Sequence, residues 1–203
     1  SQQISIIIPN VGWETGTGLS GWTQGGGGGG TASASIYTAF ARTGSQCLYL
    51  YESTGANQIT CYYDLPVPAA WVGRTITFAC YQRGDGTSDS GNMRIIVTGG
   101  TGSGYTAFTS SATWTYKAVT GTIGAGATAI RLQLESADGV SFSHAYVDDM
   151  LIAFAGSETC VGTAEAVGKL YTAVGPFILR WDETNDFWEC ANVEAAGPQA
   201  TDI

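Results

Sequence analysis

Apolar and polar residues alternate with a period of two in several short segments of this chain. In Ala129–Glu135, for example, Ile130, Leu132 and Leu134 are separated by charged or polar residues, which is typical of a strand with one buried side. Eight segments are predicted as strands: Ser33–Phe40, Gln46–Glu52, Gln58–Leu65, Thr75–Arg83, Met93–Thr98, Thr113–Thr122, Ala129–Glu135 and Ala145–Phe154.

Clusters of glycine, serine, asparagine and aspartate separate the predicted strands, and no long segment has the period of a helix. This spacing predicts an all-β fold for residues 1–155, a two-sheet antiparallel β-sandwich of the jelly-roll kind. The consecutive glycines Gly25–Gly30 would lose much backbone entropy on ordering, so we expect a surface loop there. We also expect a long loop over Thr98–Ser111.

The composition changes near Gly156. Residues 156–203 contain two basic and eight acidic residues and predict a small acidic β-hairpin tail or meander. Its strands are expected at Lys169–Val174, Pro176–Trp181 and Phe187–Ala191. So short a segment cannot form a large core. We therefore expect the tail to rest on the body, on another chain, or on a disulfide between Cys160 and Cys190, and it is a candidate assembly or docking element.

The overall composition excludes several classes of partner. Hydrophobic residues make up 44% of the 203 residues and charged residues 12%, which suits a packed core rather than disorder. The net charge is −9, with 8 Lys and Arg against 17 Asp and Glu. Nucleic acids and anionic membrane surfaces bind clustered Lys and Arg, so we expect neither as a partner. No segment reaches the roughly 18 uninterrupted apolar residues of a membrane span.

Two distant segments carry the most specific pattern in the chain. The first is Pro9–Gly16 (PNVGWETG), followed by Leu19–Trp22 (LSGW), and the second is Ala145–Ile152 (AYVDDMLI). Together they resemble the two ends of the calcium-containing jelly-roll carbohydrate-binding modules of the xylanase-associated type, a galactose-binding-like sandwich. Trp13 stands where these modules usually have Phe. The resemblance covers about residues 9–154 and continues through three shorter segments: Ser45–Leu50, Arg74–Phe78 and Thr113–Thr115.

The resemblance implies a structural calcium ion that bridges the first loop and the last strand, at Glu14 and Asp148. Along the strand, Asp148 has the same parity as Tyr146 and Ile152, so it is expected to point inward if those residues do. A buried carboxylate must be paired, hydrogen-bonded or bound to a metal, and calcium accepts carboxylates together with backbone carbonyls. The alternative is that Asp148 accepts hydrogen bonds from nearby backbone amides without a metal.

Carbohydrate recognition needs flat aromatic rings to stack on sugars, with polar neighbours for the hydroxyl groups. The outward positions of the predicted strands contain this chemistry, and they are the candidate polysaccharide-binding residues. The alternative is that they are ordinary half-exposed strand residues with cross-strand partners. The candidates are Tyr49, Tyr51, Tyr62, Tyr81, Arg83, Arg131, Gln133 and Glu135.

The sequence contains no recognisable catalytic motif, and we expect a protein that is not an enzyme. The single histidine, His144, has no nucleophile motif beside it. Asp148 and Asp149 are adjacent in a predicted strand, so they should point to opposite sides and cannot flank one glycosidic bond. There are five cysteines but no CxxC pair, so a zinc site is not expected.

Two functions from different classes remain open. The first is a non-catalytic structural or adhesive subunit of an extracellular assembly, such as a decoration or tail protein on a phage virion surface. The acidic tail would then contact neighbouring chains, a homo-oligomer is expected, and the absence of a visible export signal suits a particle released by lysis. The second is a polysaccharide-binding module that targets a secreted glycoside hydrolase or a cell-surface protein.

Overall fold

The computed structural model describes the backbone of residues 12–14, 16, 18–26, 32–53, 58–87, 90–139, 142–155, 160–166, 169–174, 177–182 and 187–190. It describes side chains as far as residue 153. The chain divides into two compact units, Ile8–Ala155 and the combination of Ser1–Ile7 with Gly156–Ile203. No helix in the described part has the length and hydropathy needed to cross a membrane.

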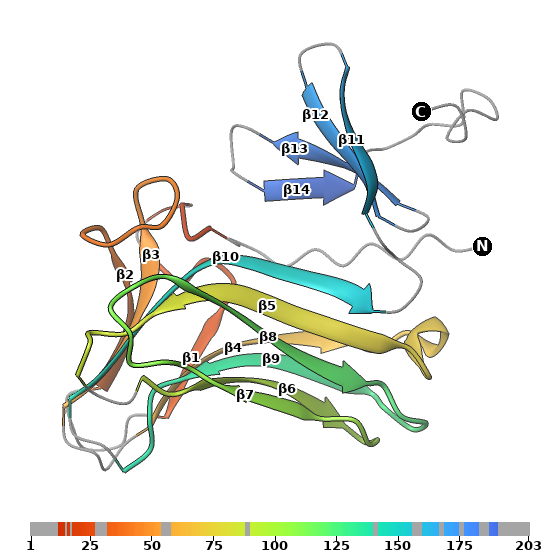
Figure 1. Cartoon of the computed structure of the whole chain (residues 1–203). Helices are drawn as coiled ribbons and strands as arrows, with labels where there is room; N and C mark the ends of the chain where they lie inside the picture. Colours follow the sequence, from red (N-terminus) through yellow and green to blue (C-terminus); the bar gives the residue numbers. More distant parts are fainter. Residues whose placement is uncertain are drawn as a thin grey trace. The chain divides into compact units, whose positions relative to one another are not determined.

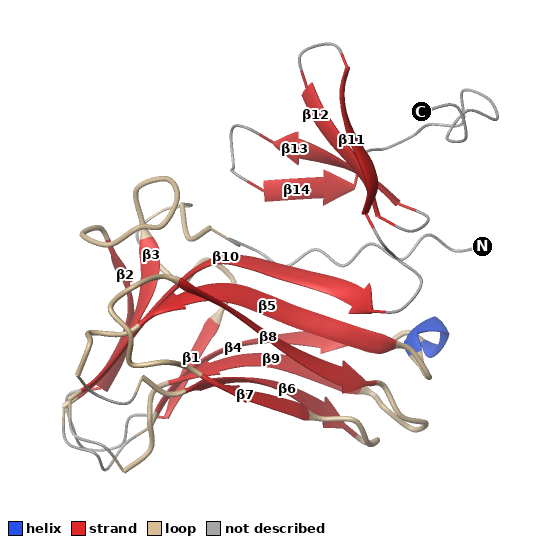
Figure 2. Ribbon diagram, viewed as in Figure 1, coloured by secondary structure: helices blue, strands red, loops and turns tan. Residues whose placement is uncertain are grey.

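The larger unit is the two-sheet antiparallel β-sandwich that the alternating pattern predicted (Figures 1 and 2). The first sheet has the strand order β1-β4-β9-β6-β7 and the second has the order β2-β3-β10-β5-β8. Between β4 and β5, the described chain forms a single 3-10 turn, η1 (Ala69–Trp71). The strands are β1 (Thr23–Gly26), β2 (Ala32–Tyr37), β3 (Cys47–Glu52), β4 (Ile59–Pro66), β5 (Thr75–Arg83), β6 (Asn92–Thr98), β7 (Gly104–Ala107), β8 (Thr115–Thr122), β9 (Ala129–Glu135) and β10 (Ser143–Ala155).

The core lies between the two sheets and is built from every second residue of the central strands. Trp22 links it to the first loop, because its ring packs 5.5 Å from that of Trp13 and 6.3 Å from that of Phe78. Each fully buried side chain of this size contributes about 1.5–3 kcal/mol. The side chains with no exposed surface include Leu48, Leu50, Ile76, Phe78, Met93, Ile95, Ile130, Leu132, Leu134 and Val147.

The strands with the clearest alternation, β5 and β9, begin and end at the predicted residues, whereas two short strands were not predicted. The expected loop over Thr98–Ser111 contains β7, so that expectation was wrong in part. A segment of four residues is too short to show a period, and β7 is defined by its pairing with β6. Gly25 and Gly26 of the glycine run belong to β1, which pairs with β4. Gly27–Gly30 lie outside the described residues.

The tail contains a four-stranded sheet with the order β11-β12-β13-β14. Trp181 is paired directly with Trp188 across β13 and β14. Cys160 and Cys190 belong to the two outermost strands, with β12 and β13 between them, and their side chains lie outside the described part, so their disulfide stays a prediction. The strands are β11 (Cys160–Ala166), β12 (Lys169–Val174), β13 (Phe177–Asp182) and β14 (Phe187–Cys190).

Candidate functional site

The strand register separates the eight candidate glycan-binding residues into two groups on opposite sides of the sandwich. All eight alternate with core residues, so they face away from the space between the sheets. However, β4 and β9 belong to the first sheet, whereas β3 and β5 belong to the second. The eight residues therefore cannot form one site. The first sheet carries Tyr62, Arg131, Gln133 and Glu135, and the second carries Tyr49, Tyr51, Tyr81 and Arg83.

We call the outward side of the first sheet the polar face. A row of paired residues crosses four of its strands and ends in a tyrosine on either side: Tyr62 on β4, Gln133 on β9, Arg94 on β6 and Tyr105 on β7. Glu135 and Asn92 are paired with each other one row away. Tyr105 is 61% exposed, so its ring is available to a ligand.

The centre of the polar face is the carboxylate of Glu135, which is only 2% exposed. It accepts a hydrogen bond from the side-chain amide of Gln133 and pairs with the Arg94 guanidinium at 3.3 Å. Asn92 is also buried, and its side-chain oxygen has no hydrogen-bond partner among the described residues. A buried acceptor without a donor is costly.

One edge of the polar face is formed by an ion pair over a tyrosine ring. Arg131 donates two hydrogen bonds of 2.8 Å to the carboxylate of Asp64. The same guanidinium lies 3.7 Å from the centroid of the Tyr62 ring. The hydrogen bonds from Arg131 lower the pKa of Asp64. Because both partners are well exposed, the pair contributes little to stability and mainly holds the side chains in place.

We call the outward side of the second sheet the tyrosine face. Tyr49 on β3 is stacked on Tyr146 on β10, with ring centroids 4.8 Å apart and planes inclined by 13°. The ring of Tyr51 is also stacked on that of Tyr49, with centroids 5.8 Å apart. Tyr37 and Phe40 pack against Tyr146. Since these rings pack against one another, the tyrosine face offers hydroxyl groups and ring edges more than free ring planes.

The first loop, the segment before β1 that contains Trp13, Glu14 and Gly16, brings together the oxygen atoms of Glu14 and its neighbours. The Glu14 carboxylate accepts hydrogen bonds from the backbone amides of Ser45 at 2.8 Å and Gln46 at 2.9 Å. The Gln46 side-chain amide lies 3.2 Å from the Trp13 carbonyl oxygen and 3.1 Å from that of Gly16. With its NH2 group turned toward them, Gln46 donates a hydrogen bond to both carbonyls. In the described part, no group of three or more His, Cys, Asp or Glu side chains could hold a metal ion.

A bulge in β10 decides where Asp148 points. The pairing of β10 with β5 shifts just after Asp148, and Asp149 has a left-handed φ of 48°. Before the bulge, Asp148 is opposite Tyr81, and after it Ile152 is opposite the core residue Phe78. The extra residue reverses the alternation. Asp148 therefore lies on the tyrosine face, and its parity with Ile152 was misleading.

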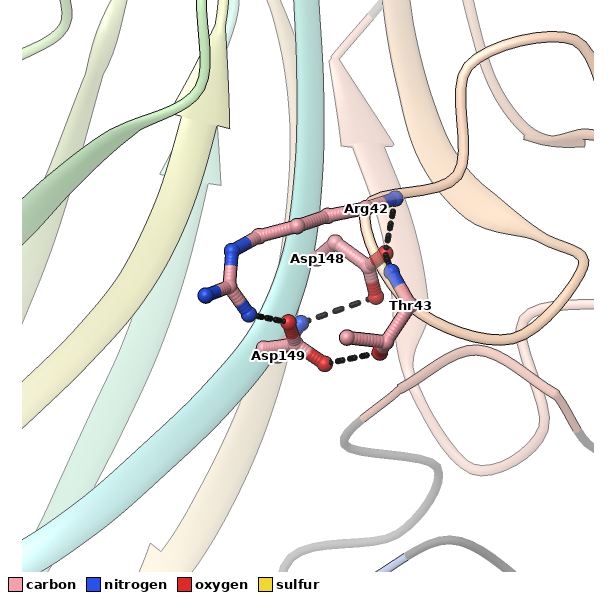
Figure 3. Close-up of polar contacts among 4 residues, drawn as sticks. All are labelled: Arg42, Thr43, Asp148 and Asp149. Atoms are coloured by element: carbon pink, nitrogen blue, oxygen red, sulfur yellow. Dashed lines mark hydrogen bonds and ion pairs between the residues drawn. The ribbon is translucent and has the colours of Figure 1, made fainter.

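Asp148 is nevertheless fully buried, because the loop after β2 covers it. Its carboxylate accepts hydrogen bonds from the backbone amides of Arg42 at 2.8 Å, Thr43 at 3.2 Å and Asp149 at 2.8 Å (Figure 3). Asp149 in turn pairs with the Arg42 guanidinium and the Thr43 hydroxyl. Burial, together with the charge of Asp149, raises the pKa of Asp148 to about 7. These hydrogen bonds agree with one of the two alternatives for Asp148, and calcium binding by Asp148 stays a prediction.

Several residues of both faces were not among the candidates. Arg94 was recognisable, because it alternates with the apolar residues of a predicted strand. Tyr105 was missed because β7 was expected to be a loop. Tyr146 shares parity with Ile152 along the strand, but the bulge in β10 places the two on opposite sides, and Tyr37 has no sequence signal that places it beside Tyr49.

The described cysteines are structural. Cys47, Cys61 and Cys80 are free thiols, and each is at most 1% exposed. Burial raises the pKa of both Cys47 and Cys61 to about 12. A thiol is a nucleophile or a metal ligand only when it is deprotonated, so these three behave as small apolar side chains.

No protein-family model matches the chain, and no curated protein matches it. Solved structures do match. One is the enzymatically active domain of tailspike protein 4 from bacteriophage CBA120, with 11% identity and a TM-score of 0.59, covering 73% of this chain and 21% of that chain. This chain therefore spans about a fifth of the tailspike domain.

Two further structures match with similar scores. An arabinose-bound α-L-arabinofuranosidase, MgGH51, has 9% identity and a TM-score of 0.55, covering 71% of this chain and 26% of that chain. The Stig cyclase Fisc from Fischerella sp. TAU has 14% identity and a TM-score of 0.55, covering 76% and 99%. Carbohydrate-binding modules with a β-sandwich fold also match, with TM-scores of 0.46 to 0.49. At these identities the first three matches show a shared fold, and function has to be argued from the site.

Proposed function

We propose that this chain is a non-catalytic, glycan-binding adhesive subunit of an extracellular assembly, such as a decoration or tail protein on a phage virion surface. The polar face would bind the polysaccharide. The observation that carries this proposal is that the polar pair of Glu135 and Asn92 lies on the same outward side of the first sheet as the exposed ring of Tyr105. Buried polar groups with fixed directions select hydroxyl groups, and a free ring plane stacks on a sugar.

The charges of the polar face favour a neutral glycan. Arg94 and Arg131 are both paired with carboxylates, so neither has a free charge to offer. The remaining groups of the row are neutral amides and phenols. Such a site would bind through hydrogen bonds and stacking, and its affinity would change little with ionic strength.

The exposed tyrosines on the edge strands provide a matched pair of variants for this proposal. We expect Tyr105→Ala to weaken retention on its polysaccharide about tenfold, the loss of one stacking contact. Tyr116 is similarly exposed, at 54%, but lies on β8 of the opposite sheet, so Tyr116→Ala should retain full binding. The measurement is affinity electrophoresis of both variants against a set of neutral plant and bacterial polysaccharides. Equal behaviour of the two variants, or no retention of the unchanged protein, would contradict the proposal.

The assembly part of the proposal is supported by two features. The acidic tail has too few apolar positions for a core of its own, and the sandwich shares its fold with a domain of a bacteriophage tailspike. We propose that the tail contacts neighbouring chains in a homo-oligomer. Light scattering of the whole chain at several concentrations tests this, because a monomer at all concentrations would exclude it. The alternative function, a module that targets a glycoside hydrolase, shares the polar face and is favoured by a monomer.

We also propose that the first loop binds a structural calcium ion. The carboxylate of Glu14, the carbonyl oxygens of Trp13 and Gly16 and, with its amide turned the other way, the side-chain oxygen of Gln46 form a donor set that suits calcium. The ion would neutralise Glu14 and hold the loop against β3. Trp13 and Gly16 both have left-handed backbones, with φ of 61° and 74°, which a bound ion would help to hold.

A chelation experiment checks the calcium proposal. A metal that binds only the folded state raises its stability. We expect EDTA to lower the melting temperature by several degrees and added calcium to restore it. The variant Glu14→Gln, which removes the one charge of the donor set, should melt at the same temperature with and without EDTA. An unchanged melting temperature of the original protein in EDTA would remove calcium from the proposal.

A further inference from the structure

The tyrosine face contains an arginine without an acidic partner. Arg42, Arg94 and Arg131 each pair with a carboxylate. Arg83, on β5, makes no ion pair with any residue in the described part of the chain, and its buried Nε donates no hydrogen bond there. In a chain with 17 acidic and 8 basic residues, a guanidinium left without a carboxylate is unexpected.

Aromatic rings hold this guanidinium in place. Its central carbon lies 4.2 Å from the centroid of the Phe40 ring, and Arg83 is paired with Tyr146 across β5 and β10. The cation–π contact fixes the plane of the guanidinium and supplies no hydrogen-bond acceptor. The guanidinium of Arg83 is therefore oriented by the protein, and no hydrogen bond within the described residues uses its Nε.

The tyrosine face also carries several hydrogen-bonding side chains. The Tyr49 hydroxyl lies 2.7 Å from Nδ1 of His144, and the rings of Tyr49 and Tyr146 are stacked with centroids 4.8 Å apart. On its other side, the His144 ring approaches the Asp85 carboxylate at 3.9 Å. Hydroxyl groups, an imidazole and a guanidinium thus line one surface, which is the chemistry that recognises a sugar with an acidic group.

We propose that the tyrosine face is a second glycan-binding site, separate from the polar face, that takes a sugar residue bearing a carboxylate or sulfate group. Arg83 pairs with the anionic group, and the hydroxyl groups of Tyr49 and Tyr146 contact the neighbouring sugar hydroxyls. This inference rests on the proposed glycan-binding function but uses different residues on the opposite sheet. It predicts that one molecule holds a neutral glycan on one face and an acidic glycan on the other.

The test compares two ligands that differ only at carbon 6. α-1,4-Linked trigalacturonate carries carboxylates where α-1,4-linked galactotriose carries hydroxymethyl groups, and a sulfated galactotriose distinguishes sulfate from carboxylate as the anionic group. Calorimetric titration of the whole chain should show binding of at least one acidic ligand, and this binding should weaken as sodium chloride is raised. Arg83→Gln should reduce that affinity at least tenfold, and Arg83→Lys should reduce it less, because it keeps the charge but not the planar fork.

Replacing a basic residue elsewhere in the chain controls for the change in net charge. Lys117 on β8 is paired with the core residue Cys80, so it lies on the other side of the second sheet from Arg83. Lys117→Gln removes the same charge and should leave the binding of the acidic ligand unchanged. Melting temperatures of all variants verify that they are folded.

Each failure is recognisable. If the acidic ligands do not bind, or if Arg83→Gln binds them as tightly as the original chain, the second site is excluded. If, in addition, Arg83→Gln changes the oligomeric state, the tyrosine face is a contact between chains instead. The polar-face proposal fails by a different result, the absence of an effect of Tyr105→Ala on neutral polysaccharides, and that result leaves the behaviour of Arg83 unaffected.

Discussion

Replacing Gly91 by alanine is expected to destabilise the sandwich by on the order of 4 kcal/mol or more. Gly91 stands just before β6 with a φ of 101°, a conformation that residues with a side chain rarely adopt. A Cβ atom there would overlap the backbone carbonyl oxygen of Glu135 and lie 2.6 Å from the carbonyl carbon of Ser136. Backbone atoms of a central strand cannot move aside, so β6 would have to separate from β9.

Gly73 provides the matched control for this substitution. It also has a left-handed backbone, with a φ of 85°, but a Cβ atom added to it would meet nothing within 4 Å. Gly73→Ala should therefore cost only the backbone strain, about 1–2 kcal/mol. Urea unfolding of both variants measures the difference. Similar losses for the two glycines would show that the close approach of β6 and β9 at Glu135 is wrong, and the polar face with it.

The free energy of unfolding should decrease as the pH rises from about 4 to about 7, because of Asp148. Burial raises the pKa of this carboxyl to about 7 in the folded state, whereas its ordinary value is 3.8. Between these values the folded chain holds a proton that the unfolded chain has released. The stabilisation is fully present below pH 3.8 and is lost as the pH rises through 7, a change of up to about 4 kcal/mol.

The variant Asp148→Asn isolates this contribution from the other titrating groups. Asparagine keeps an oxygen for the amides of Arg42 and Thr43, but it cannot accept from the amide of Asp149 while doing so. It should therefore lose about one hydrogen bond, roughly 1 kcal/mol, at every pH. Unfolding free energies measured in EDTA at pH 5 and pH 8 should differ more in the original chain than in the variant. An equal difference in both proteins would show that Asp148 stays ionised throughout.

The fold was predictable because its strongest signal is local. In β5 and β9, a strict alternation of apolar and polar residues specifies a strand with one buried side, and both strands have the predicted bounds. The short strand β7 carries no such signal, since four residues cannot display a period, and it forms only because β6 offers unpaired backbone groups. Tyr105, the most exposed ring of the polar face, was missed for this reason.

The candidate site was predictable only in part, because a face is made by strands that are distant in sequence. Alternation showed that Gln133 and Tyr49 both point outward from their strands, but it could not show that their strands belong to different sheets. For Asp148, the local pattern gave the wrong side, since a single extra residue after it reverses the alternation of β10.

The local sequence pattern was enough to predict the long strands of the sandwich and the side chains that alternate into its core. These properties follow from the period of the backbone and from composition, and both can be read one segment at a time. Long-range pairing was needed to show that Tyr62 and Glu135 share a face with Tyr105, and that Arg83 lies beside Phe40 and Tyr146 without an ion pair in the described part of the chain. Such neighbours are selected by long-range strand pairing and by bulges, whose energies depend on the whole sandwich rather than on any single segment.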